Sequence, residues 1–365
     1  MVCTRLFSWF LVAALCRPLP GMAWSQLGGD AQRSSHGTAS IAAQPAVLWQ
    51  QPLGDIAYSS AIVGDNVVFT VAGRAVQARN ADSGKLFWGM ENSSEMSATP
   101  VLVGRWLVIG GKDGIVRALE RNTGKQAWEF RTGGRVVAAL LASTDTVYVG
   151  ATDHYMYALA ADSGRLRWRF EAPDYKYGGL YAPATYADDT VYFGVKNAWF
   201  YAVEARTGVM RWRTLLGSAM YAAPVVADGR IYIGSYDRHL YALRQSDGAV
   251  LWRTAFADWP QGAGLLDGGR VHVACRNGEV VALNRDDGNV EWRLGIGGEL
   301  RHGPILGRNG RALLGTMSGE VVTLDLEHGK LAGRRFVSGA VHAQPALSVK
   351  GVFVTTLTGE LVRLQ

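Results

Sequence analysis

Asp-Ser-Gly-Arg-Leu-Arg-Trp, residues 162–168, is one copy of the pattern that decides the fold of this chain. The pattern consists of a polar pair, a glycine, three further residues and a tryptophan. Its glycines are 40, 40, 44, 40 and 40 residues apart, at Gly84, Gly124, Gly164, Gly208, Gly248 and Gly288. A seventh copy at Gly329 has Gly333 where the tryptophan is expected. A fixed period of about forty residues indicates a repeat architecture.

Each period contains four short runs of strand-forming residues. In the period that includes Trp212 the runs are residues 183–186, 190–194, 199–203 and 209–214, and turn residues separate them. Four antiparallel strands every forty residues are typical of a β-propeller blade. No period shows apolar residues at helical spacing over ten or more positions, which excludes a helical solenoid.

The number of blades follows from the innermost strands. Eight segments start near a proline or small residue, at Ser60, Pro100, Ala139, Pro183, Pro224, Ala263, Pro304 and Pro345. The last unit ends at Gln365 with three strands, and the early segment 47–49 is an outer strand with no inner strands before it. We therefore predict an all-β, eight-bladed propeller of four-stranded antiparallel blades, closed by residues 46–53, which complete the last blade.

Tryptophans of the outer strands are expected to pack between blades. In most periods a small residue such as Ala118 lies in the third strand and leaves room for a large ring. These structural tryptophans are Trp49, Trp88, Trp128, Trp168, Trp212, Trp252 and Trp292. The seventh period has no ring and has Thr323 in the small-residue position, and the eighth has Arg363 there, which the repeat does not explain.

The first residues have the layout of a secretory signal peptide. Arg5 precedes an apolar stretch of eleven residues, 6–16, and small residues before position 24 indicate cleavage after Ala23. So short a stretch disfavours a retained membrane anchor, and Leu15 before Cys16 disfavours lipidation there.

The expected organisation has three parts. We predict a signal peptide over 1–23, a lead-in segment over 24–45 and a single propeller over 46–365. The protein is then periplasmic or secreted, a monomer, and peripheral to a membrane at most.

Composition and charge argue against several classes of function. The formal net charge of +6 falls to +4 when Arg5 and Arg17 leave with the signal peptide, and the remaining basic residues are spread through the repeats. This balance is not a nucleic-acid signature. Cys275 is then the only cysteine, so an internal disulfide and a cysteine metal cluster are excluded. No Ser-His-Asp set can be assembled by spacing, and we predict no catalytic, cofactor-binding or metal-ligating residue.

The repeat resembles the pyrroloquinoline quinone (PQQ) repeat family. Tyr157-Ala158-Leu159 and Tyr241-Ala242-Leu243 stand just before the turn, and residues 24–30, Trp-Ser-Gln-Leu-Gly-Gly-Asp, are similar to the lead-in of many members. The resemblance covers nearly the whole mature chain. It implies the propeller fold but is unspecific for activity.

Two branches of that family imply different functions. The quinoprotein dehydrogenases hold PQQ and calcium in a central funnel, are much longer and often carry an adjacent cysteine pair, whereas BamB-like members are cofactor-free scaffolds that help assemble outer-membrane β-barrels. This chain is short, and acidic residues such as Asp82 and Asp162 lie in turns, where they favour the turn backbone.

The resemblance therefore favours a non-catalytic scaffold without a cofactor that binds an envelope protein. A small oxidoreductase dependent on PQQ and calcium, or a propeller that binds a small ligand, is the alternative. The missing lipidation site and the basic charge depart from the BamB-like pattern.

Candidate binding residues are expected at one mouth of the channel, where the loops from each outer strand to the next inner strand gather. Residues just before the inner strands are Tyr181, Tyr221, Arg301, His302 and His342, and the longest connection adds Tyr175, Lys176 and Tyr177. Rigid tyrosines beside cations are typical of protein-binding patches. The two histidines lack a third ligand, so hydrogen-bonded rim residues are favoured over a metal site.

Overall fold

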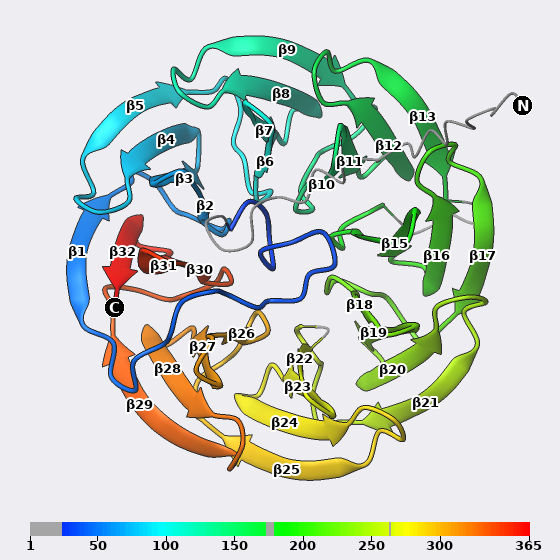
Figure 1. Cartoon of the computed structure of the whole chain (residues 1–365). Coiled ribbons are helices and arrows are strands. Elements are labelled where there is room, and N and C mark those ends of the chain that lie inside the picture. Colours follow the sequence, from blue (N-terminus) through cyan, green and yellow to red (C-terminus); the bar gives the residue numbers. More distant parts are fainter. Residues whose placement is uncertain (1–23, 173–178, 263) are drawn as a thin grey trace, which may run out of the picture.

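The computed structural model describes residues 24–172, 179–262 and 264–365, which form a closed ring of eight sheets (Figure 1). Every sheet has four antiparallel strands, and the described residues contain no helix. The predicted eight-bladed propeller is thereby confirmed. The predicted signal peptide, 1–23, lies outside the described residues. Within the described ranges, no helix is long and apolar enough to cross a membrane.

Strands of each blade follow one another from the channel to the circumference. Blades one to four are β2 (Ile62–Gly64), β3 (Val67–Ala72), β4 (Ala75–Asn80), β5 (Leu86–Glu91); β6 (Val101–Val103), β7 (Trp106–Gly110), β8 (Ile115–Glu120), β9 (Gln126–Arg131); β10 (Leu141–Ser143), β11 (Thr146–Gly150), β12 (Tyr155–Ala160), β13 (Leu166–Glu171); and β14 (Thr185–Ala187), β15 (Thr190–Gly194), β16 (Trp199–Glu204), β17 (Met210–Leu215).

Blades five to eight continue the ring. They are β18 (Val225–Ala227), β19 (Arg230–Ser235), β20 (His239–Arg244), β21 (Val250–Ala255); β22 (Leu265–Asp267), β23 (Arg270–Ala274), β24 (Glu279–Asn284), β25 (Val290–Gly295); β26 (Ile305–Leu306), β27 (Arg311–Gly315), β28 (Glu320–Asp325), β29 (Lys330–Phe336); and β30 (Ala346–Ser348), β31 (Gly351–Thr355), β32 (Glu360–Leu364) with β1 (Val47–Pro52).

The first strand closes the ring, as the sequence predicts. β1 pairs antiparallel with β32, with Gln50 opposite Val362. Beyond the strand, the Ala46 amide donates to the Gln365 carbonyl at 2.7 Å, and the reverse bond is 3.0 Å long. The C-terminal edge of the last blade is therefore covered by the chain itself.

The tryptophans of the outer strands pack onto the turn glycine of the next blade. A Cβ added at Gly164 would lie 2.4 Å from the Trp128 ring, and the backbone φ of 69° at this glycine also disfavours a side chain. The Trp128 indole N–H donates to the Ala161 carbonyl at 3.0 Å. Ala118, opposite Trp128 in the sheet, leaves space for the ring. The equivalent pairs are Trp49–Gly84, Trp88–Gly124, Trp168–Gly208, Trp212–Gly248, Trp252–Gly288 and Trp292–Gly329.

Blade seven has a different occupant at this position. A Cβ on Gly333 would lie 2.1 Å from the Ala43 carbonyl oxygen, because the lead-in segment passes directly over β29. Arg335 holds it there by donating to the Pro45 carbonyl at 2.9 Å. A tryptophan ring at position 333 would collide with this segment, which explains why the seventh repeat lacks one.

Arg363, which the repeat did not explain, joins blade eight to blade one. Its guanidinium donates to the Lys350 carbonyl and to the Asp82 carbonyl, both at 2.7 Å. The side chain therefore bridges the junction at which the ring closes.

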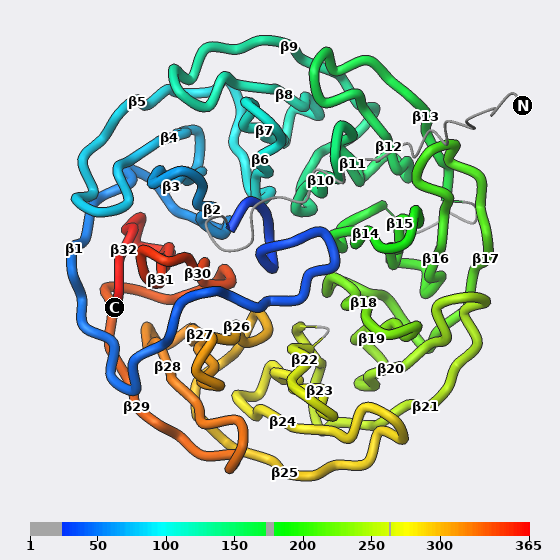
Figure 2. Tube along the Cα trace, viewed as in Figure 1, coloured from blue at the N-terminus to red at the C-terminus, as the bar shows by residue number. Residues whose placement is uncertain are grey.

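The lead-in segment, residues 24–45, crosses the centre of the ring (Figure 2). Its backbone pairs with the edges of the inner strands: Trp24 exchanges hydrogen bonds of 2.7 and 2.9 Å with Val63, and the amides of Leu102 and Tyr186 donate to Ser25 and Ala31. The segment then leaves past the turn between β26 and β27, where Asn309 bonds Ile41. Inner-strand backbone groups that would otherwise face the channel thereby acquire partners.

Candidate functional site

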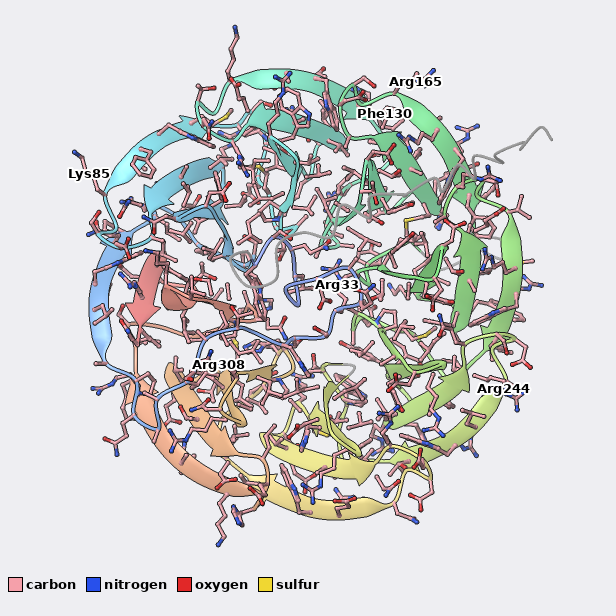
Figure 3. All side chains as sticks on the ribbon, viewed as in Figure 1. Arg33, Lys85, Phe130, Arg165, Arg244 and Arg308 are labelled. Atoms are coloured by element: carbon pink, nitrogen blue, oxygen red, sulfur yellow. The ribbon has the colours of Figure 1, made fainter. Side chains whose placement is uncertain are left out.

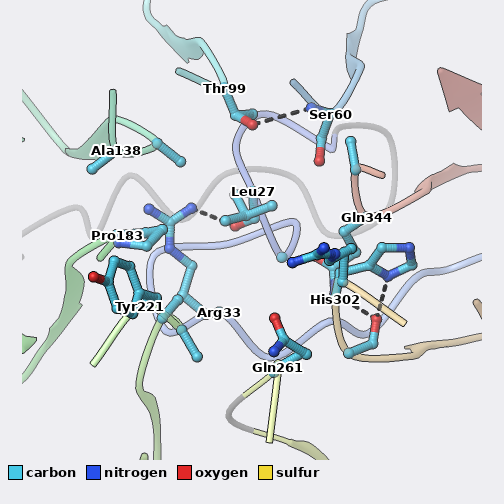
Figure 4. A pocket seen from close by; sticks show the side chains of 18 of the residues that line it. Leu27, Arg33, Ser60, Thr99, Ala138, Pro183, Tyr221, Gln261, His302 and Gln344 are labelled. Atoms are coloured by element: carbon cyan, nitrogen blue, oxygen red, sulfur yellow. Dashed lines mark hydrogen bonds between the residues drawn. The ribbon is translucent and has the colours of Figure 1, made fainter. Parts of the chain in front are cut away.

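A cavity of about 250 Å³ lies at the centre of the propeller. Its wall comes from the loops that precede the inner strands of all eight blades, and the lead-in contributes Leu27, Gly28, Arg33 and Ser35 (Figure 4). We call the end of the ring that carries these loops the loop face, and the opposite end, with the turns between first and second strands, the turn face. The lead-in leaves over the turn face, so it separates the cavity from that end of the channel.

Five of the eight candidate residues predicted from the sequence line this cavity: Tyr181, Tyr221, Arg301, His302 and His342. They come from four blades and meet because every loop before an inner strand points to the same axis. Tyr175, Lys176 and Tyr177 lie outside the described residues. Binding by any of the eight stays a prediction.

Arg33 anchors the lead-in beneath the cavity and was not found by sequence reasoning. Its side chain is buried at the centre, whereas Lys85, Arg165 and Arg244 lie at the circumference (Figure 3). The guanidinium donates to the carbonyls of Leu27, Leu140 and Ala184 at 2.5, 3.0 and 3.1 Å. Burial lowers the pKa of Arg33 to about 10, so the group stays cationic at neutral pH. The local sequence around Arg33 has no strand pattern that would have marked it.

The two histidines differ from ordinary surface histidines in burial and in partners. His302 is 7 % exposed, and its Nδ1 donates to the Gly303 carbonyl at 2.9 Å. Burial lowers the pKa of His302 to about 4, and burial also lowers the pKa of His342. Tyr58 meets His342 edge to face, with ring centroids 5.5 Å apart. Both imidazoles are therefore neutral at neutral pH.

A row of aromatic rings extends from the cavity over the loop face. We call Tyr181, Tyr221, Tyr236 and Trp259 the aromatic arc. The centroids of Tyr181 and Tyr221 are 6.2 Å apart, those of Tyr221 and Tyr236 4.5 Å, and those of Tyr236 and Trp259 4.5 Å with the planes at 5°.

Cations stand at both ends of the aromatic arc. The Lys196 ammonium lies 5.7 Å from the centre of the Tyr181 ring, and the Arg276 guanidinium lies 5.0 Å from the Trp259 ring. Glu299 accepts from Arg276 and from Arg301, each at 2.7 Å. Sequence reasoning found Tyr181 and Tyr221 and missed the other two rings. Trp259 could have been found, because it is a tryptophan outside the repeat position.

The lining of the cavity does not fit a calcium-bound quinone. Calcium takes six to eight oxygen ligands, carboxylates among them, and no carboxylate lines the described part of the wall. Among residues 24–172, 179–262 and 264–365, no group of three or more His, Cys, Asp or Glu side chains is placed to hold a metal ion. Cys275 is fully buried, and burial raises the pKa of its thiol to about 12.

Comparisons with known proteins find the same repeat and the same ring. A family model described as outer membrane protein assembly factor BamB matches residues 72–184, 157–299 and 276–365. BamB from Moraxella catarrhalis has 19 % identity and a TM-score of 0.76, over 88 % of this chain and 99 % of that chain. No curated protein matches this chain in sequence.

Two redox enzymes have a similar ring. A europium-containing methanol dehydrogenase has 12 % identity and a TM-score of 0.79, over 95 % of this chain and 98 % of that chain. The quinohemoprotein alcohol dehydrogenase from Comamonas testosteroni has 14 % identity and a TM-score of 0.78, over 94 % and 80 %. Identities this low show a common fold and do not choose between a scaffold and an enzyme.

Proposed function

This chain belongs to the family of the outer membrane protein assembly factor BamB, and we propose that it is a non-catalytic scaffold that binds another protein of the envelope. The proposal places it in the periplasm after removal of residues 1–23. Its partner would be a component of the machinery that assembles outer-membrane proteins.

The observation that carries the proposal is the aromatic arc with its flanking cations. Interfaces concentrate their binding energy in tryptophan, tyrosine and arginine side chains that are rigid before the partner arrives. Stacking between Tyr236 and Trp259 fixes both rings, and Tyr181 remains 39 % exposed. Lys196 and Arg276 give the two ends a positive charge, which favours a partner surface that combines apolar and acidic residues.

Substitution of the arc tests the proposal. We expect Trp259→Ala, alone and with Tyr236→Ala, to reduce recovery of an assembly component from detergent-solubilised envelopes by at least tenfold. Truncation of an aromatic residue that is a binding hot spot costs about 2 kcal/mol or more of binding free energy, which accounts for such a loss. Cross-linking followed by mass spectrometry would identify the partner and its contact residues.

Trp106→Ala provides the matched control. Trp106 is also half-buried and carries a guanidinium, that of Arg105, 4.4 Å from its ring, but it stands at the β6–β7 turn on the turn face. This variant should retain the partner. Equal recovery by all variants, or recovery of no assembly component by the unsubstituted protein, contradicts the proposal.

A further inference from the structure

Three polar atoms at the cavity have no hydrogen-bond partner although they are buried. They are His302 Nε2, His342 Nδ1 and Arg301 Nε, and all three residues line the same cavity. A buried polar group without a partner is unfavourable, and sites where several converge are commonly completed by a ligand. The side chain of His302 is more than nine-tenths buried, so bulk water does not reach it freely.

The existing hydrogen bonds and ion pairs limit what each of the three residues can offer to a ligand. His302 donates through Nδ1 to the Gly303 carbonyl, which leaves Nε2 of the neutral ring as an acceptor. His342 Nδ1 also has no partner, and it offers a donor or an acceptor according to the tautomer of the neutral ring. Arg301 Nε is a donor, and Nη2 of the same guanidinium is paired with Glu299. A matching ligand must donate one hydrogen bond to His302 Nε2, accept one from Arg301 Nε, and be able to do either at His342 Nδ1.

The size of the cavity and the residues of its wall further limit the class of ligand. A cavity of about 250 Å³ is smaller than the roughly 300–1,000 Å³ of sites for drug-sized molecules. Tyr58 and Tyr221 both line the cavity and give its wall aromatic parts, and the Tyr221 ring is drawn in Figure 4. Hydroxyl groups both donate and accept, and the C–H faces of a small sugar or polyol can lie on aromatic rings.

We propose that the central cavity binds a small neutral polyhydroxylated molecule of the monosaccharide or polyol class, whose hydroxyls donate to His302 Nε2, accept from Arg301 Nε and form a hydrogen bond with His342 Nδ1. An anion is disfavoured because the lone pair of His302 Nε2 points at the site and the Arg301 guanidinium already has a carboxylate partner in Glu299. The polar atoms of this site lie outside the aromatic arc, and of the arc only Tyr181 and Tyr221 line the cavity, whereas Tyr236 and Trp259 do not.

Saturation-transfer NMR on the full mature chain tests the proposal, with D-glucose, D-galactose, D-mannose, myo-inositol and glycerol as probes. Inorganic phosphate, and PQQ with calcium, serve as separate arms. At least one sugar or polyol should receive saturation, and titration calorimetry should then give its affinity. We expect His342→Phe to weaken that affinity about tenfold, the loss of one hydrogen bond, since phenylalanine keeps the ring against Tyr58.

Two further variants separate binding from folding. His302→Gln should lower the affinity for the same probe. Thermal unfolding of each variant shows whether it is still folded. His239→Phe makes the same exchange at a half-buried histidine on β20, outside the cavity lining, and should bind the probe as the unsubstituted protein does.

The proposal is wrong if no sugar or polyol receives saturation at millimolar concentration, or if only phosphate or PQQ binds. It is also wrong if a folded His342→Phe variant binds the probe with unchanged affinity. A crystal structure grown with the probe that shows only ordered water on His302 Nε2 would contradict it as well. Trp259→Ala should keep the bound sugar, so loss of the partner and loss of the ligand are distinguishable.

Discussion

His272 on β23 occupies the position at which blades four and five have a tyrosine that packs on the outer-strand tryptophan. Tyr192 and Tyr232 meet Trp212 and Trp252 in this way, with centroids 5.9 Å apart. The His272 ring lies 5.4 Å from that of Trp292, but it is fully buried and neither of its nitrogens has a partner. A histidine at this position therefore leaves two polar atoms unsatisfied in an apolar environment.

We expect His272→Phe to stabilise the protein by about 1–3 kcal/mol, the cost of leaving buried polar atoms unpaired. Burial lowers the pKa of His272 to about 3, against 6.5 for an ordinary histidine. The unfolded chain therefore binds the proton first, and the free energy of unfolding must fall as the pH drops from about 6.5 towards 3. Above pH 6.5 this group has no effect.

Urea unfolding at pH 7.5 and at pH 4.5 measures both effects. The variant should be more stable at each pH and should lose less stability between them, while His302 maintains part of the slope because burial lowers its pKa to about 4. An unfolding midpoint lower than that of the unsubstituted chain at pH 7.5 would show that phenylalanine does not fit beside Trp292.

For single residues, the sequence predicts which side chains reach the channel but not what they contact there. The position within the repeat alone places His302 and His342 at the mouth of the channel, because the equivalent loop of every repeat lies near the propeller axis. Their missing partners depend on Gly303, Tyr58 and the lead-in, and no spacing rule contains that information. The same limit explains why Trp259 was missed, since its role depends on Tyr236 of another blade.

Among the elements, the lead-in segment is the one that the repeat does not determine. The side-chain amide of Gln26 bonds the backbone of Ala142 as a neighbouring strand would. It accepts from the Ala142 amide at 3.0 Å and donates to the Ala142 carbonyl at 3.4 Å. Arg33 reaches carbonyls 107 and 151 residues away in the chain. Strands are predictable because their residue pattern repeats locally, whereas the path of the lead-in depends on single long-range bonds.

Gly333 on β29 tests this dependence. We expect Gly333→Ala to lower the melting temperature and to expose residues 42–46 to proteolysis, because its Cβ would meet the backbone of Ala43 at 2.1 Å. Gly333→Trp, which restores the repeat pattern, should lower the melting temperature further and increase the proteolysis of residues 42–46.

Gly295→Ala is the matched control for this position. Gly295 also lies in an outer strand, and a Cβ there would have no atom within 4 Å. Its melting temperature should match that of the unsubstituted chain. A Gly333→Ala variant as stable and as protease-resistant as this control would mean that the lead-in does not hold its place over β29.

For the whole molecule, closure of the ring depends on the junction between the first and last blades. β1 pairs with β32, and its Trp49 ring lies against Gly84 of blade one while donating to the Ala81 carbonyl at 3.2 Å. Lys350 and Asp82 form an ion pair of 2.9 Å across the same gap. One strand therefore covers the edge of blade eight and also supplies the packing between the last blade and the first.

Removal of this strand should open the ring and make the chain self-associate. A chain of residues 53–365 exposes the β32 edge, and unpaired edges bind other strands. We expect it to form dimers or larger species on size exclusion with light scattering. A synthetic peptide of residues 24–53 should restore the monomer, because it supplies β1 as well as the lead-in. The shorter peptide 24–45 lacks β1 and should leave the oligomers intact. Closure does not depend on β1 if this shorter peptide restores the monomer, or if the chain of residues 53–365 is already monomeric.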